Sequence, residues 1–72
     1  MATADHPVYR VTQIVGTSST SWEDATKNAI ETAAKSLRDL RIAEVEKLDV
    51  KVEDGKVVAY RARVSLSFKY EG

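Results

Sequence analysis

The sequence contains no cysteine, so neither a disulfide framework nor a thiolate metal centre is available to the chain. Its single histidine, His6, lies near the N-terminus, and one imidazole cannot hold a structural zinc ion by itself. A domain of 72 residues buries only about 60% of its unfolded surface, so its core is marginal without further support. Subunit association is the source of stability that remains.

The chain also lacks an excess of charge of either sign, because eleven Lys and Arg residues balance eleven Asp and Glu residues. Such a surface neither repels further copies of the chain nor offers nucleic acid a basic patch. The longest apolar run, VVAY, has four residues, far short of a membrane span, and the N-terminus shows no secretory signal pattern. The sequence therefore predicts a cytoplasmic protein with no nucleic-acid or membrane partner.

Hydrophobic periodicity predicts three strands and one helix behind a short lead-in. We expect residues 1–7 to form this lead-in and residues 8–72 to form one domain. Alternating, β-branched segments predict strands at 8–15, 42–52 and 57–70, with the even-numbered residues of the last strand packed on the helix. Spacings of three and four predict a helix of about 17 residues. Its apolar stripe consists of Trp22, Ala25, Ala29, Ala33, Leu37 and Leu40.

Polar and glycine residues mark the ends of these segments. Gly16 is expected to end the first strand, and the hydroxyl run 17–21 is expected to form a loop that caps the helix. Two cap alternatives fit the spacing of a capping box: Thr20 with Glu23, or Ser21 with Asp24.

The second strand changes the phase of its alternation, which predicts a bulge near Glu46–Lys47. Asp54-Gly55 predicts a tight hairpin between the second and third strands. A crossover through the helix makes the first two strands parallel, so the third strand fits between them. The predicted fold is α+β: a β-α-β-β chain with a three-stranded antiparallel sheet, order 1-3-2, packed on one helix. Its outer strands are open edges that favour pairing with another copy.

Several segments together resemble the dodecin family. They are Gly16-Thr17-Ser18 after the first strand, a helix starting near Trp22, Ala43-Glu44-Val45, the glycine hairpin and the closing strand 64–68. The resemblance implies a hollow homododecamer that binds or stores flavins such as FMN or riboflavin between subunits.

The same resemblance identifies the flavin-site positions as Ile42, Glu44 and Arg61, with Lys69 as a phosphate contact. Ile42 stands where the family has a stacking tryptophan, so a contribution of about 0.5–1.5 kcal/mol per stacked pair is lost. Arg61 replaces a glutamine and cannot accept a hydrogen bond from the imide N–H of the ring. We expect flavin binding to be weakened or altered.

Thr20-Ser21-Trp22-Glu23 and Arg61 bring the sequence closer to a branch called calcium dodecins. Calcium takes six to eight oxygen ligands, and no contiguous calcium loop is present, so a site would be assembled between elements or subunits. Glu44, Glu46 and Asp49 are the metal-ligand candidates. Glu23 and Asp24 are further acids near the helix start.

The residues offer no catalytic constellation, since no histidine accompanies a serine and an acid on ordered elements, so an enzyme is not expected. Trp22 is interpreted as packing the helix start against the core. Arg61 and Arg63 are expected to pair with Glu44 and Glu46 on the neighbouring strand, and the alternative is an anion or flavin-phosphate site inside an assembly. The alternative function is a structural or interaction shell with no small-molecule ligand.

Overall fold

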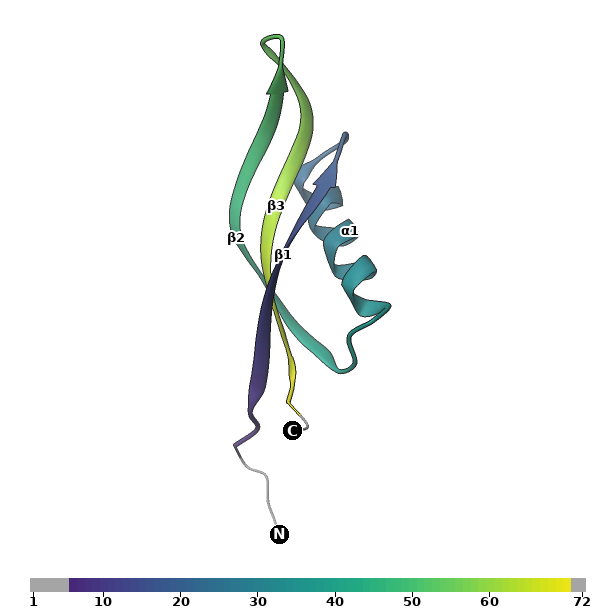
Figure 1. The fold of residues 1–72 in the computed structure, drawn as a ribbon, viewed down its shortest axis with the longest axis vertical. Helices are drawn as coiled ribbons and strands as arrows, with labels where there is room; N and C mark the ends of the chain where they lie inside the picture. Colours follow the sequence, from purple (N-terminus) through teal and green to yellow (C-terminus); the bar gives the residue numbers. More distant parts are fainter. Residues whose placement is uncertain (1–5, 71–72) are drawn as a thin grey trace.

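The computed structural model describes residues 6–70 as one helix lying across one face of a three-stranded sheet (Figure 1). Its elements are β1 (Tyr9–Ser18), α1 (Trp22–Ala34), β2 (Leu40–Glu53) and β3 (Lys56–Lys69). The strand order is β1-β3-β2, and both neighbouring pairs are antiparallel. The predicted α+β fold and strand order are confirmed. Residues 1–5 of the predicted lead-in and 71–72 of the predicted domain lie outside the described residues.

The start of α1 follows the second of the two predicted caps. Ser21 is the N-cap, and its hydroxyl accepts a hydrogen bond from the Asp24 backbone N–H at 3.0 Å. The Ser18 hydroxyl donates to the Asp24 carboxylate at 2.7 Å and accepts from the Thr20 N–H at 2.9 Å. The hydroxyl run therefore satisfies the Asp24 N–H, one of the donors that the first helical turn leaves free, and holds the segment that leads into the helix.

The helix is shorter than the sequence predicts, because it ends at Ala34. Tight turns follow, with the Ser36 N–H bonded to the Ala33 carbonyl, and Asp39 adopts a left-handed conformation (φ 56°). Leu37 thus packs on the core from a connecting turn, and Leu40 opens β2.

Gly16 does not end the first strand, contrary to the prediction. The strand continues to Ser18, and Gly16 pairs with Ala62 in the middle of the ladder. A Cβ at this position would lie 2.1 Å from the Ala25 carbonyl oxygen and 2.7 Å from the Ala29 Cβ. Glycine is needed here for the close approach of helix and strand, not for a turn.

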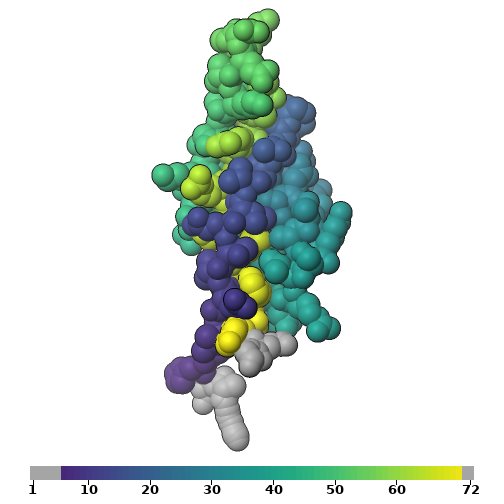
Figure 2. Space-filling model, in the orientation of Figure 1, coloured from purple at the N-terminus to yellow at the C-terminus, as the bar shows by residue number. Residues whose placement is uncertain are grey.

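The predicted bulge and hairpin are both present. The register of β2 on β3 shifts between Val45 and Lys47, which leaves Glu46 as the extra residue. Asp54 (φ 52°) and Gly55 (φ 73°) both have positive φ, as a two-residue hairpin turn of the right twist requires. The end of this hairpin extends beyond α1 and gives the chain a long dimension of 59 Å (Figure 2).

The core of a single chain is small. Its buried apolar residues are Ala25, Ala29, Ala62, Val64 and Leu66, and the three from β3 come from the even-numbered face predicted to meet the helix. Among residues 6–70, only Val64 and Leu66 are large side chains that are fully buried. The helix lies mainly over β1 and β3, so much of β2 has no cover on either face.

Candidate functional site

The face of the sheet opposite α1, called the open face below, gathers all the predicted site residues of the second and third strands. Residues that pair directly across antiparallel strands point to the same face. Because Ala62, Val64 and Leu66 point to the helix, the odd-numbered residues of β3 and their partners point away. The rows across the open face are Val11–Ser67–Ile42, Gln13–Ser65–Glu44, Val15–Arg63–Lys47 and Thr17–Arg61–Asp49, with Lys69 beyond them opposite Tyr9.

The strongest polar contact of this face joins Asp49 to Arg61. The Arg61 Nε donates to Oδ1 at 2.7 Å and Nη2 donates to Oδ2 at 3.0 Å, a two-point ion pair. The hydrogen bond from Arg61 lowers the pKa of Asp49, an effect that partial desolvation opposes and the charges of Arg61 and Arg63 reinforce. The same hydrogen bond and the Asp49 charge raise the pKa of Arg61. Both groups are therefore charged throughout the neutral range.

Trp22 ties the start of the helix to the strand that carries Asp49. Its indole Nε1 donates to the Asp49 backbone carbonyl at 3.0 Å, and its ring meets the Tyr60 ring edge to face at a centroid distance of 5.2 Å. Trp22 therefore packs against Tyr60 and the strand of Asp49 and not against the buried core, and its ring remains 38% exposed. The start of α1 is thus bonded to the Asp49 backbone in β2 and packed against Tyr60 in β3.

A second polar cluster spans all three strands at the bulge. Gln13 of β1 donates to Glu46 at 2.8 Å and to the Ser65 hydroxyl at 3.2 Å, and Ser65 donates to Glu46 at 2.5 Å. The predicted ion pairs of Arg61 and Arg63 with Glu44 and Glu46 are wrong for residues 6–70. The reason is that the bulge moves Glu46 onto Ser65 and brings Asp49 opposite Arg61.

The three calcium candidates share the open face but do not converge in one chain. Glu44 and Asp49 are five residues apart along β2, about 16.5 Å at 3.3 Å per residue, whereas calcium ligands lie at about 2.3–2.6 Å from the ion. Both oxygens of Asp49 are bonded to Arg61, and both oxygens of Glu46 accept from Ser65 and Gln13. Among residues 6–70 no three acidic or histidine side chains could hold one metal ion. The described part of a single chain therefore provides no set of ligands that fits calcium.

The flavin-site positions fit a flavin only in part. Ile42 is 55% exposed and offers an apolar but non-aromatic surface, while Arg61 is held by Asp49. Lys69 lies eight residues from Arg61 along β3, about 27 Å at 3.4 Å per residue, which is longer than an FMN molecule. A flavin on a single chain would contact both Arg61 and Lys69 only with both side chains extended towards it.

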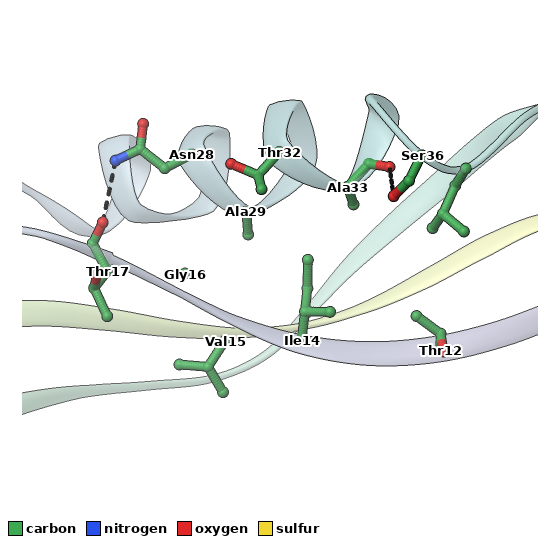
Figure 3. A pocket seen from close by; sticks show the side chains of 11 residues that line it. Thr12, Ile14, Val15, Gly16, Thr17, Asn28, Ala29, Thr32, Ala33 and Ser36 are labelled. Carbon is green, nitrogen blue, oxygen red and sulfur yellow. Dashed lines mark hydrogen bonds between the residues drawn. The ribbon is translucent and has the colours of Figure 1, made fainter.

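The opposite side of β1 carries a groove of about 500 Å³ between the strand and α1 (Figure 3). In that view Ile14 points towards the helix and Val15 points away from it, towards the open face. Asn28 bridges the groove by donating from its side chain to the Thr17 carbonyl at 3.1 Å. None of the groove-lining residues that the structure describes is charged, so the groove has no features of an ion site.

The sequence and the fold match known proteins over almost their whole length. The profile of the dodecin family matches residues 8–71. The chain belongs to the dodecin family. It is 42% identical over 62 residues to the calcium dodecin of Mycobacterium tuberculosis, covering 86% of this chain and 87% of that protein.

Solved dodecin structures have the same architecture. Dodecin from Streptomyces coelicolor matches with a TM-score of 0.87 at 35% identity, covering 94% of this chain and 97% of the other. The crystal structure of the M. tuberculosis calcium dodecin, described as calcium chelating with a novel calcium-binding site, matches with a TM-score of 0.79 at 43% identity. That match covers 89% of this chain and 91% of the other. The predicted membership of the family is therefore confirmed.

Two sets of contacts in this dodecin-family chain were not predicted from the sequence. Gln13 and Ser65 join Glu46 in the cluster at the bulge, and the backbone of Asp49 accepts from Trp22. Counting the register through the predicted bulge would have identified Asp49 as the partner of Arg61.

Within the part of the chain that the structure describes, no helix has the length and apolar character needed to cross a membrane.

Proposed function

We propose that this chain is a non-enzymatic subunit of a closed dodecin shell of twelve copies that binds small molecules or ions at its subunit interfaces. The observation that carries the proposal is the imbalance between a very small core and the large apolar side chains left exposed on both faces of the sheet. On the open face these include Val11, Val15 and Ile42, which are 62%, 46% and 55% exposed.

The helix-side face of β2 is just as apolar where α1 does not reach it. Val45, Leu48 and Val52 are 44%, 50% and 55% exposed. Fully covering one such side chain contributes about 1.5–3 kcal/mol, so several of them together outweigh the cost of ordering subunits against one another. The two edge strands, β1 and β2, add unpaired backbone groups that another copy can satisfy.

The ligand part of the proposal follows the residues of the open face. Ile42 and the engaged Arg61 support weaker binding of FMN or riboflavin than a stacking tryptophan and a free amide would give. Similarity to a calcium dodecin supports calcium as a second ligand, with Glu44, Glu46 and Asp49 acting only together with carboxylates of other subunits. Lys69 remains a phosphate contact to a ligand held mainly by another copy.

One observation favours a second candidate, a shell with no small-molecule ligand. The polar groups of Asp49, Arg61 and Glu46 are already bonded to one another or to neighbouring side chains. Thermal-shift measurements with riboflavin, FMN and calcium distinguish the two candidates, because a ligand that binds only the folded state raises its melting temperature. A reproducible shift rejects the empty shell, and no shift with any of the three rejects the storage function.

Native mass spectrometry tests the assembly. The proposal predicts a species near 96 kDa, which is about twelve times the 8.0 kDa chain mass. Leu48→Asp is expected to shift the population to smaller species. The introduced carboxylate stays in contact with water in a lone chain, whereas assembly of the shell would bury it. Lys27→Asp, on the exposed side of α1, changes the charge by more and serves as the control. A wild-type monomer near 8 kDa at micromolar concentration would contradict the proposal.

A further inference from the structure

We infer that Asp49 suppresses the binding of phosphate-bearing ligands on the open face by neutralising Arg61. The inference rests on the proposed function, in which the open face takes part in ligand binding. It adds a specificity determinant: the carboxylate at position 49 decides whether a group of cationic side chains is free to attract an anion.

The cationic side chains are Arg61, Arg63 and Lys47, which lie in two neighbouring rows of the open face. Lys47 pairs with Arg63 across the strands, and Arg61 is two residues along β3 from Arg63, about 7 Å at 3.4 Å per residue. That separation is within the Debye length of about 8 Å at physiological ionic strength, so the charges act on a ligand together. Three cations so close together form an anion-attracting patch in a protein whose net charge is zero.

Asp49 removes the best donor from this patch. A guanidinium recognises phosphate by presenting two parallel N–H groups, and Arg61 presents two of its N–H groups to the Asp49 carboxylate at 2.7 and 3.0 Å. The indole of Trp22 holds the Asp49 backbone carbonyl at 3.0 Å, which anchors the strand position from which the carboxylate reaches Arg61. An incoming phosphate must therefore displace Asp49 or approach a neutral pair.

The other acids near the pair do not take over the role of Asp49. Glu46 is bonded to Gln13 and Ser65, and Glu44 lies two rows away from Arg61. The pair is also well exposed, with 42% of the Arg61 side chain and 53% of the Asp49 side chain accessible. Exposed ion pairs contribute little to folding stability, so the Asp49→Asn variant is expected to fold. Its effect is then expected in the affinity for phosphate-bearing ligands.

The experiment compares FMN with riboflavin, which differ by one phosphate, and adds inorganic pyrophosphate as a probe with no ring. Asp49→Asn is expected to raise the affinity for FMN and for pyrophosphate by about fivefold in calorimetric titrations at low salt, and to change the affinity for riboflavin much less, because riboflavin brings no phosphate to the released Arg61. The gain is expected to shrink at high salt. The double variant Asp49→Asn/Arg61→Gln is expected to return to wild-type affinity, because the released guanidinium is then absent.

Glu53→Gln is the matched control, since Glu53 lies on the same strand, pairs with Lys51 at 3.4 Å and gives the same change in net charge. Equal gains in Glu53→Gln and Asp49→Asn would show a general charge effect and overturn the inference, as would no gain in Asp49→Asn. Native mass spectrometry of the same samples distinguishes failure of the proposed function from failure of the role assigned to Asp49. Loss of the shell speaks against the proposed function, whereas an intact shell without the phosphate-specific gain speaks against the role of Asp49 alone.

Discussion

Replacing Gly16 by alanine is expected to separate α1 from β1. The added Cβ would lie 2.1 Å from the Ala25 carbonyl oxygen and 2.7 Å from the Ala29 Cβ, whereas ordinary contacts begin near 3.4 Å. The closest atom is the backbone carbonyl oxygen of Ala25 within α1, so no rotamer change can make room. The helix must therefore move away by about 1 Å or more, the difference between 3.4 and 2.1 Å.

This movement disturbs the side chains that make up the small core. Ala25 and Ala29 are two of its five buried apolar residues, and they face Ala62 and Val64 of β3. Overpacking a tight site costs about 1–3 kcal/mol. At about 4–8 °C per kcal/mol for a domain of this size, a cost of about 2 kcal/mol lowers the melting temperature by about 10 °C.

Thermal unfolding followed by circular dichroism, at one fixed protein concentration, measures the effect, because assembly makes the melting temperature depend on concentration. Thr17→Ala is the matched control: it changes the next residue of β1, whose side chain is exposed on the open face, and should cost about 0.5 kcal/mol or less. A melting temperature of Gly16→Ala within about 2 °C of wild type would refute the packing argument.

Three further perturbations test local contacts. Ser21→Ala removes the N-cap acceptor and should cost about 1 kcal/mol in urea unfolding, whereas Ser21→Asp, which keeps an acceptor, should cost much less. Trp22→Phe keeps an aromatic ring but loses the hydrogen bond to the Asp49 carbonyl, so faster amide hydrogen exchange is expected near the start of α1. Unchanged exchange rates would show that this hydrogen bond does not stabilise the helix start. Acid titration should show that the Asp49–Arg61 contribution is constant above the ordinary carboxyl pKa of 3.8 and is lost as the pH falls through the lowered pKa of Asp49. Asp49→Asn should remove that acid-dependent component, and an unchanged profile would contradict it.

Much of the fold could be predicted from the sequence because its signals are local. The alternation of β3, the Asp54-Gly55 turn and the phase change near Glu46 each depend on a few neighbouring residues. The ends of elements were harder to predict. Gly16 resembles a strand end when it is considered alone, yet its absent side chain allows contact with Ala25 and Ala29, which lie nine and thirteen residues further along the chain. Leu37 and Leu40 continue the helical spacing, although the left-handed Asp39 turns the chain into β2.

The contacts of the candidate site were not predicted from the sequence. Ile42, Glu44 and Arg61, which the resemblance gives as flavin-site positions, share the open face of the sheet. Which side chains bond there depends on register, and a shift of one residue moves every side chain to the other face. The residue types alone cannot show which acid bonds to Arg61, since Glu44, Glu46 and Asp49 all occur within six positions of the same strand.

The bulge at Glu46 links the fold to the chemistry of the open face. In an unbroken ladder continuing from Val45 opposite Val64, Glu46 would oppose Arg63 and Leu48 would oppose Arg61. The extra residue instead brings Lys47 opposite Arg63 and Asp49 opposite Arg61, and it turns Leu48 to the helix side. One inserted residue therefore exchanges an apolar neighbour of Arg61 for a carboxylate and adds a cation beside Arg63. The charge selectivity assigned to Asp49 is thus a consequence of strand register, and the Gln13–Glu46–Ser65 cluster that holds the bulge supports it from across the sheet.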